Sequence, residues 1–300
     1  MESFVLILSY IIIGLLLRRM RVMPENSSVV LNTYVLYVAL PALILKNIPL
    51  LNFSSALYIP ALTPWFLLVC VVLLTLGLAR LFKWSREVTG ALLIILPLGN
   101  TSFLGFPMTE ALFGKAGMPY AVVYDQLGSF IALTTYATVV AALYSPKVAT
   151  PSVRTVLLKI LCFPSFIALI LGLLIRDLAW PGFMHSLING LSATLVPVVM
   201  IAVGFQLHFR FSRNELNPMI SALSIKLIAM PFLAWLLWQS LGQSGLVVDI
   251  SIFQAAMPPM ISAGALAIMA GLAPRLVSGV IGFGILFGLV TLPVVAWLLA

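Results

Sequence analysis

Charged residues make up only 8% of this sequence of 300 residues, against 62% hydrophobic residues. A soluble globular domain carries about three times that fraction of charge. A water-soluble fold is therefore excluded, because this much apolar surface exceeds what one protein core buries. We predict an all-α membrane protein whose apolar runs lie in a lipid bilayer.

Cysteine and histidine are also scarce, with 2 of each. Cys70 and Cys162 lie in separate apolar runs, at a spacing that fits neither a metal site nor a disulfide framework. Intramembrane aspartate pairs, Ser/His arrangements and acid-rich metal-binding motifs are absent from the sequence as well. We therefore expect no catalytic residues, no metal and no cofactor, so the protein is not an enzyme.

The excess of basic residues gives a formal net charge of +8. In a soluble protein this charge would suggest a nucleic acid partner. Here the basic residues cluster in short loops between apolar runs, where they report membrane orientation. We expect the lipid bilayer as a partner and no nucleic acid.

Ten apolar runs have the length of about 20 residues that crosses a bilayer. Ten spans place twelve basic residues, Arg210 and Arg213 among them, on one side of the membrane. The other side holds three, Lys46, Lys115 and Arg176, so the first side is cytoplasmic and both termini lie outside. We expect a multi-pass protein of the cytoplasmic (inner) membrane. The predicted spans are residues 3–19, 28–46, 59–82, 88–113, 118–143, 155–176, 184–206, 217–240, 246–271 and 275–299.

The two halves of the chain resemble each other at a shift of about 158 residues, which sets Asn100 over Pro258. Each half then holds five helices. Because five is odd, the second half crosses the membrane in the opposite direction, and the repeats are inverted. The predicted first repeat, cytoplasmic linker and second repeat are residues 1–145, 146–154 and 155–300.

The fourth helix of each repeat contains residues that disfavour a continuous helix. Proline removes a backbone donor and glycine loosens the backbone, so we expect the chain to unwind there. Each break lies roughly 13–18 Å along its helix, near the middle of a core about 30 Å thick. The predicted substrate-binding and crossover residues are Asn100, Thr101, Ser102, Gly105 and Pro107 in one break and Gln254, Pro258, Pro259, Ser262 and Gly264 in the other.

Unwound backbone at this depth is tolerated only where protein or a wet cavity supplies hydrogen-bond partners. The N-terminal ends of half-helices favour an anion, and their C-terminal ends favour a cation. The two breaks therefore predict a polar binding site. Prolines that merely kink two packed helices are the alternative.

Three polar residues within apolar runs are candidates for ion coupling or charge: Asp125, Gln126 and Lys226. An ionised group inside a membrane is costly unless it is paired or wetted, so it marks a functional site by default. Asp125 would carry a coupling proton or lie in a wet vestibule, and Gln126 is expected to face a different side of the helix. Lys226 would attract an anion, pair with Asp125, replace a coupling cation, or reach the membrane surface. Glu110 is expected at the interface.

Two stretches resemble signatures of the auxin efflux carrier family. "GNTSFLGFP" resembles its Asn-Thr-x-x-x-Gly-x-Pro motif on the fourth helix, and "FQAAMPP" resembles its Gln-Ala-Ala-x-Pro motif on the ninth. Weaker matches, "LNTYVLYVALP", "VGFQL" and "TLP", follow the family's order along the chain. The short loops, and the "MISAG" that departs from the plant pattern, indicate a compact bacterial-type member.

The resemblance implies a fold like that of sodium/proton antiporters and bile acid symporters, with crossing broken helices 4 and 9. It also implies a scaffold domain of helices 1, 2, 6 and 7, a transport domain of helices 3–5 and 8–10, and elevator-type alternating access. Family members carry organic anions such as auxins, malate or malonate, and we expect a homodimer. By the motif, Asn100 would contact the substrate or stabilise the crossover, and Pro107, Pro258 and Pro259 would shape it.

The sequence thus predicts a secondary transporter for a small organic anion, coupled to H⁺ or Na⁺ or driven by the membrane potential alone. A cation/proton antiporter on the same architecture is the alternative. Such an antiporter usually needs acids beside the crossover, and the nearest acids in the sequence are Asp125 and Glu110.

Overall fold

The computed structural model describes residues 2–51, 55–145, 147–148, 152–176, 178, 180–207 and 215–299. Within these ranges the regular secondary structure is helical, apart from one isolated bridge. Among the residues that the structure describes, six helices are long and apolar enough to cross a membrane, and the bent pair α10 and α11 would make a seventh. The predicted loop cations Arg210 and Arg213 and part of the linker 146–154 lie outside the described residues.

The chain forms two compact units. Unit 1 comprises Met1–Ser54, Ser102–Val122 and Lys159–Leu207, and unit 2 comprises Ser55–Thr101, Val123–Leu158 and His208–Ala300. Helices α7 (Met118–Tyr124) and α10 (Val153–Leu161) contain boundaries between the units, and α10 begins inside the predicted linker.

The main elements of unit 1 are α1 (Glu2–Arg19), α2 (Ser27–Tyr34), η1 (Val35–Ala39), α3 (Leu40–Asn47), α6 (Gly105–Phe113), η4 (Lys115–Gly117), α11 (Pro164–Leu174), α12 (Gly182–Ala193) and α13 (Leu195–Gln206). Those of unit 2 are α4 (Tyr58–Leu81), α5 (Arg86–Ile95), η5 (Asp125–Ser129), α8 (Phe130–Ala132), η6 (Leu133–Ala137), α9 (Thr138–Tyr144), α14 (Leu216–Ser224), η8 (Ile225–Ala229), α15 (Met230–Ser240), α16 (Leu246–Ala255), α17 (Ile261–Met269) and α18 (Pro274–Leu299).

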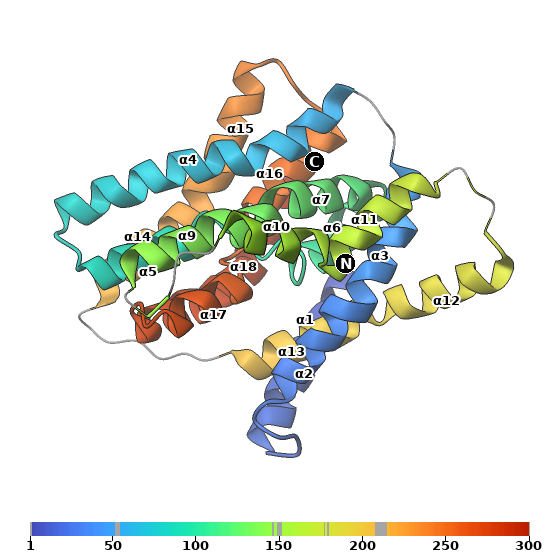
Figure 1. Cartoon of the computed structure of the whole chain (residues 1–300), viewed down its shortest axis with the longest axis horizontal. Helices are drawn as coiled ribbons and strands as arrows, with labels where there is room; N and C mark the ends of the chain where they lie inside the picture. The colour runs from blue at the N-terminus through green and yellow to red at the C-terminus, as the bar shows by residue number, and fades with distance from the viewer. Residues whose placement is uncertain are drawn as a thin grey trace. The chain divides into compact units, whose positions relative to one another are not determined.

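Small residues allow the helices of unit 1 to pack closely. Helix α1 packs along α13 (Figure 1), and a Cβ on Gly14 or on Gly204 would collide with the backbone of the other helix. Close backbone approach of this kind is how helices associate where lipid removes the hydrophobic driving force. The Arg18 guanidinium donates to the Leu207 carbonyl at 2.6 Å and ties the two helices together near one end of the contact.

Widened π-helical turns precede two of the intrahelical prolines. The turn η1 ends at Ala39, two residues before Pro41, and η8 ends at Ala229, two residues before Pro231. Proline lacks an N–H and its ring clashes with the carbonyl four residues earlier, and a wider turn relieves this clash. The structure places a π-turn in front of each of these prolines.

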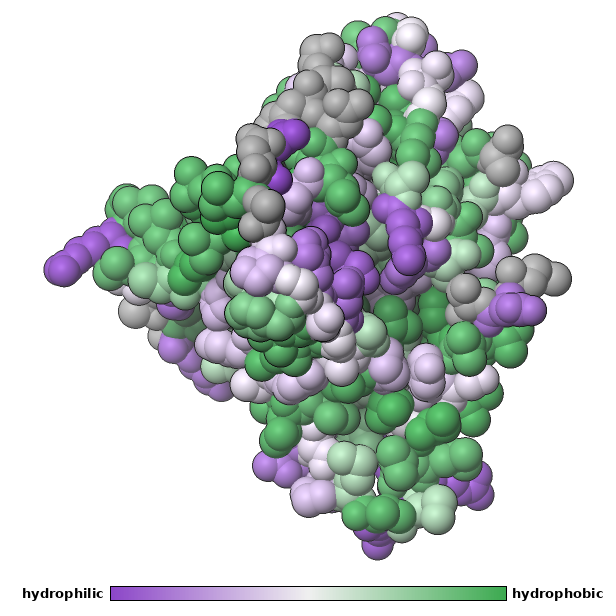
Figure 2. All heavy atoms as spheres, turned by 90° about the vertical axis from the view of Figure 1, so that its right-hand side faces the viewer, coloured by the Kyte–Doolittle hydropathy of each residue, from purple (hydrophilic) through white to green (hydrophobic). Residues whose placement is uncertain are grey.

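The surface is largely apolar, as lipid contact requires. Leu73, Val290 and Trp297 are among many large hydrophobic side chains that are more than half exposed. Figure 2 shows a face covered mainly by hydrophobic residues, with hydrophilic residues gathered in patches. A monomeric soluble protein rarely exposes apolar patches of this extent.

Candidate functional site

Each segment that the sequence predicts to unwind contains a non-helical stretch, although Gly105, Pro107, Gln254, Ser262 and Gly264 lie in the flanking helices. Helix α5 ends at Ile95 and α6 begins at Gly105, while α16 ends at Ala255 and α17 begins at Ile261.

Proline causes the first break directly. In a continued helix the Leu93 carbonyl would accept from the N–H of residue 97, but Pro97 has none. The Tyr136 hydroxyl donates to the Leu93 carbonyl instead, at 2.9 Å. A side chain thus satisfies the carbonyl that the proline leaves without a backbone donor.

The two breaks pair with each other inside unit 2. Gly99 and Pro259 form an antiparallel bridge. The Asn100 N–H donates to the Pro258 carbonyl at 2.8 Å, and the Met260 N–H donates to the Leu98 carbonyl at 2.9 Å. Each break therefore supplies a donor and an acceptor to the other, which is how non-helical backbone becomes tolerable at membrane depth.

Two glycines of α18 make room for the crossover prolines. A Cβ on Gly284 would lie 2.8 Å from Cδ of Pro259, and a Cβ on Gly288 would lie 3.3 Å from Cγ of Pro258. Sequence analysis missed both positions. Their signal is the spacing of four residues in "GILFG", which puts both glycines on one helix face.

Asn100 offers an unused donor at the crossover. Its side chain is buried, and Nδ2 has no hydrogen-bond partner among the residues that the structure describes. A buried amide that lacks a partner costs about 1–3 kcal/mol. A group kept at this cost inside a polar break is suited to donate to a ligand.

Lys226 lies against the backbone of the same crossover. Its side chain is fully buried in the π-turn η8, so it does not extend to the surface. A Cβ on Gly99 would lie 3.4 Å from Nζ of Lys226, and this Nζ donates to Sδ of Met230 at 3.1 Å. A thioether is a weak acceptor. The ammonium is therefore available to an anion bound beside Gly99.

Asp125 is joined to the crossover through Thr101. The Thr101 hydroxyl donates to Oδ1 of Asp125 at 2.5 Å, and Nε2 of Gln126 donates to Oδ2 at 2.8 Å. Asp125 and Gln126 both lie in the π-turn η5 and are buried. The expectation that Gln126 faces a different side from Asp125 is wrong, since its amide caps the neighbouring carboxylate.

Gly128 brings this π-turn close to α4. A Cβ on Gly128 would collide with the ring of Pro64, and Nε1 of Trp65 donates to the Leu127 carbonyl at 3.0 Å. The widened turn and the glycine together hold Asp125 in place beside Thr101.

The remaining predicted residues fall into two groups. Gln254 is fully buried in the last turn of α16, while Ser262 and Gly264 lie in the first turn of α17, where Gly264 meets the Ile281 side chain of α18. Ser102, Gly105 and Pro107 belong to unit 1, with Gly105 and Pro107 buried in α6. Unit 2 thus brings together ten of the thirteen predicted residues, Asn100, Thr101, Asp125, Gln126, Lys226, Gln254, Pro258, Pro259, Ser262 and Gly264.

Long apolar helices, an apolar surface and a buried polar crossover define a multi-pass integral membrane protein. The family model described as "Membrane transport protein" matches residues 1–296. The chain belongs to this family of membrane transporters, the auxin efflux carrier family that its motifs resemble.

Two archaeal relatives are similar over nearly their whole length. An uncharacterized transporter of Methanothermobacter thermautotrophicus is 27% identical over 302 residues, which cover 97% of this chain and 96% of the relative. An uncharacterized transporter of Methanocaldococcus jannaschii is 24% identical over 308 residues, which cover 100% of this chain and 98% of the relative.

Proposed function

We propose that the protein is a secondary transporter that moves a small organic anion, such as a carboxylate, across the cytoplasmic membrane, and that it is not an enzyme. The observation that carries the proposal is the buried Lys226 ammonium beside Gly99, next to Asn100, whose Nδ2 has no hydrogen-bond partner in the described part of the chain. An ammonium and an amide N–H are both donors to a carboxylate, and charge-assisted hydrogen bonds of this type are the strong ones. Helix α17 begins one residue after Met260 and adds the positive end of its dipole.

We further propose ten spans in two inverted repeats, a scaffold domain, a transport domain and elevator-type movement. The composition of the two units supports this proposal. Unit 1 takes residues 1–54 and 159–207, and unit 2 takes 55–101 and 208–300, so matching parts of the two repeats fall in the same unit at a shift near 158. Residues 102–122 differ, because they group with unit 1 although the proposal assigns helices 4 and 5 to the transport domain. A homodimer with both termini outside completes the proposal.

Uptake into proteoliposomes tests the proposed function. We expect the purified protein to take up at least one small radiolabelled carboxylate, and Asn100→Ala to lower the apparent affinity about tenfold, the lower end of the worth of a hydrogen bond to a charged group. The melting temperature should stay near that of the wild type, since alanine removes a buried group whose Nδ2 bonds to none of the residues that the structure describes. Wild-type uptake by Asn100→Ala would place the substrate elsewhere.

Asp125 is the proposed site of proton coupling. We expect Asp125→Asn to retain substrate binding while its uptake no longer responds to an imposed H⁺ gradient, because the asparagine oxygen still accepts from the Thr101 hydroxyl but the side chain cannot take up a proton. Thr101→Val is the matched variant, since it removes the hydrogen bond to Oδ1 and leaves the carboxylate. Uptake by Asp125→Asn that still follows the H⁺ gradient would exclude Asp125, and Na⁺ gradients are tested in the same series.

A cation/proton antiporter remains the second candidate, and the bond between Thr101 and Asp125 is the observation that favours it. This bond brings an acid within one residue of the crossover, where an antiporter needs one. The same liposomes distinguish the two functions. An antiporter would exchange Na⁺ for H⁺ with no carboxylate present, whereas an anion transporter would not.

A further inference from the structure

Unit 1 contains a polar pocket made by residues other than those of the crossover. Its volume is about 310 Å³, at the lower end of the range of about 300–1,000 Å³ seen for ligand cavities, so it fits a small ligand. Apolar side chains, including Leu43, Leu50, Met118 and Val196, form part of its wall.

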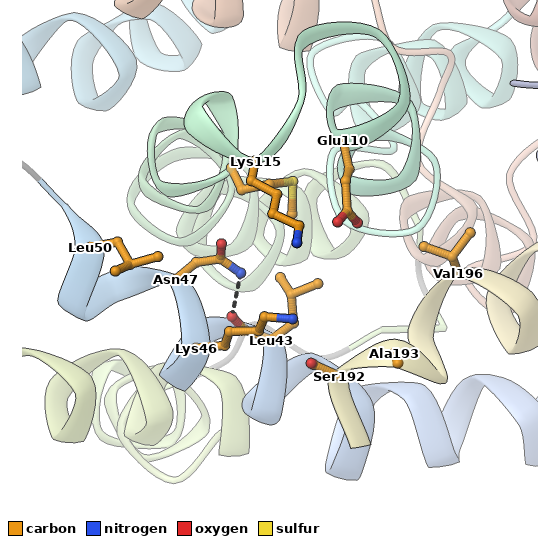
Figure 3. Close-up of a pocket in the computed structure, with 10 residues that line it drawn as sticks. Leu43, Lys46, Asn47, Leu50, Glu110, Lys115, Ser192, Ala193 and Val196 are labelled. Carbon is orange, nitrogen blue, oxygen red and sulfur yellow. Dashed lines mark hydrogen bonds between the residues drawn. The ribbon is translucent and has the colours of Figure 1, made fainter. Parts of the chain in front are cut away.

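The charged groups of the pocket come from three elements. Lys46 lies in the last turn of α3, Glu110 in α6, and Lys115 at the start of η4. Figure 3 shows the charged ends of these three side chains pointing towards the same open space. Two ammonium groups and one carboxylate leave this space with a net positive charge.

A glycine turn brings Lys115 to the same space as Glu110. Gly114 has a φ of +72°, a left-handed conformation that favours glycine, and its N–H donates to the Glu110 carbonyl at 3.1 Å. The chain therefore reverses immediately after α6. Without this reversal Lys115 would continue along the axis of α6 and away from Glu110.

Buried polar groups complete the lining. Nδ2 of Asn47 donates one of its two N–H groups to the Leu43 carbonyl at 2.8 Å, which leaves the other for a ligand (Figure 3). The Ser192 hydroxyl is 5% exposed and also lines the cavity. The pocket thus presents donors and positive charge within apolar walls, as small-molecule sites do.

We propose that this pocket is a second binding site, specific for a small carboxylate anion held by Lys46 and Lys115. The two lysines supply charge-assisted hydrogen bonds to the carboxylate, and Asn47 adds a neutral donor. Glu110 repels the anion and keeps its affinity moderate, so a bound anion is released again. The ligand class follows from the charges of the pocket and does not depend on transport.

Acylation of lysine amines, measured with and without malonate as the ligand, tests the site on the full-length protein in detergent. A water-soluble N-hydroxysuccinimide ester modifies the lysines, and mass spectrometry gives the rate at each one. We expect saturating malonate to slow modification of Lys46 and Lys115 at least about threefold relative to chloride of equal ionic strength. Lys159, exposed on α10, is the internal control and should not change. Equal protection by chloride, or no protection, would overturn the proposal.

Two variants, one that removes a positive charge and one that removes a negative charge, test whether the pocket binds an anion. Lys115→Gln should raise the malonate concentration that half-protects Lys46 about tenfold, the loss expected for one charge-assisted hydrogen bond. Glu110→Gln should lower that concentration about fivefold, because a repelling charge is removed. If Glu110→Gln instead weakens protection by malonate, Glu110 does not repel the bound anion, and the charge argument behind the proposal is wrong.

Asn100→Ala separates this site from the proposed transport function. We expect protection of Lys46 and Lys115 by malonate to be unchanged in Asn100→Ala, because Asn100 does not line the pocket. Loss of protection in this variant would show that the anion binds at the crossover and not here. Protection in a protein that transports no carboxylate would leave the pocket standing and refute the transport proposal.

Discussion

Replacing Lys226 by methionine is expected to lower the apparent affinity for the transported anion about 10- to 150-fold, the worth of one hydrogen bond to a charged group. The variant should also melt a few degrees higher than the wild type. Methionine has nearly the length of lysine and fills the same space, but it does not bring an ammonium into apolar surroundings, which costs several kcal/mol without a counter-charge. Loss of function together with a gain in stability is typical of a group kept for binding.

Uptake and thermal unfolding measured on the same detergent-purified preparation check this prediction. Lys159→Met is the matched control, since Lys159 is exposed on α10, and it should change neither quantity. Wild-type affinity in Lys226→Met would mean that the anion does not bind beside Gly99.

A second measurement separates two roles of the Lys226 ammonium, binding the anion and substituting for a coupling cation. If its ammonium substitutes for a coupling cation, uptake by Lys226→Met should be low without sodium and recover when Na⁺ is added. If the ammonium binds the anion itself, Na⁺ should restore nothing. The measurement is the Na⁺ dependence of uptake at zero membrane potential.

The second large effect is expected at Gly284, where a single methyl group should displace the crossover. In Gly284→Ala the new Cβ would lie 2.8 Å from Cδ of Pro259, closer than packed atoms allow. Overpacking of this kind costs about 1–3 kcal/mol. Because Pro259 bridges Gly99, its displacement should also move the groups beside Gly99, and uptake should fall strongly.

A graded series of glycine substitutions provides the control. Gly77 in α4 has open space around the position of a Cβ, so Gly77→Ala should stabilise the protein by about 0.5–1 kcal/mol through helix propensity alone. Gly288→Ala should lie between the two, since its Cβ would approach Cγ of Pro258 to only 3.3 Å. Thermal unfolding and uptake that do not follow the order Gly77, Gly288, Gly284 would contradict the steric argument.

The sequence by itself determined the positions of several long helices and of the two breaks. Apolar runs such as 59–82 and 275–299 correspond to α4 and α18, because hydropathy over about 20 residues is enough to commit a segment to the bilayer. Pro97 and Pro258 mark breaks for an equally local reason, since a proline removes a hydrogen bond within its own turn. The same motifs were sufficient to indicate the family.

Only the tertiary structure decided which polar groups meet. Lys226 and Gly99 are remote in sequence and adjacent in space, and no local pattern encodes that contact. The pairing of Gln126 with Asp125 was predicted wrongly because the ideal helix of 3.6 residues per turn does not describe a π-turn. Gly284 was missed because its role is steric. The residue for which it makes room, Pro259, lies in the crossover and not in α18. Sequence analysis assigned Lys46, Glu110 and Lys115 to loops and the membrane interface, because hydropathy is a property of each residue and its neighbours in sequence. A pocket forms only where separate elements pack, and packing places these three residues around one cavity.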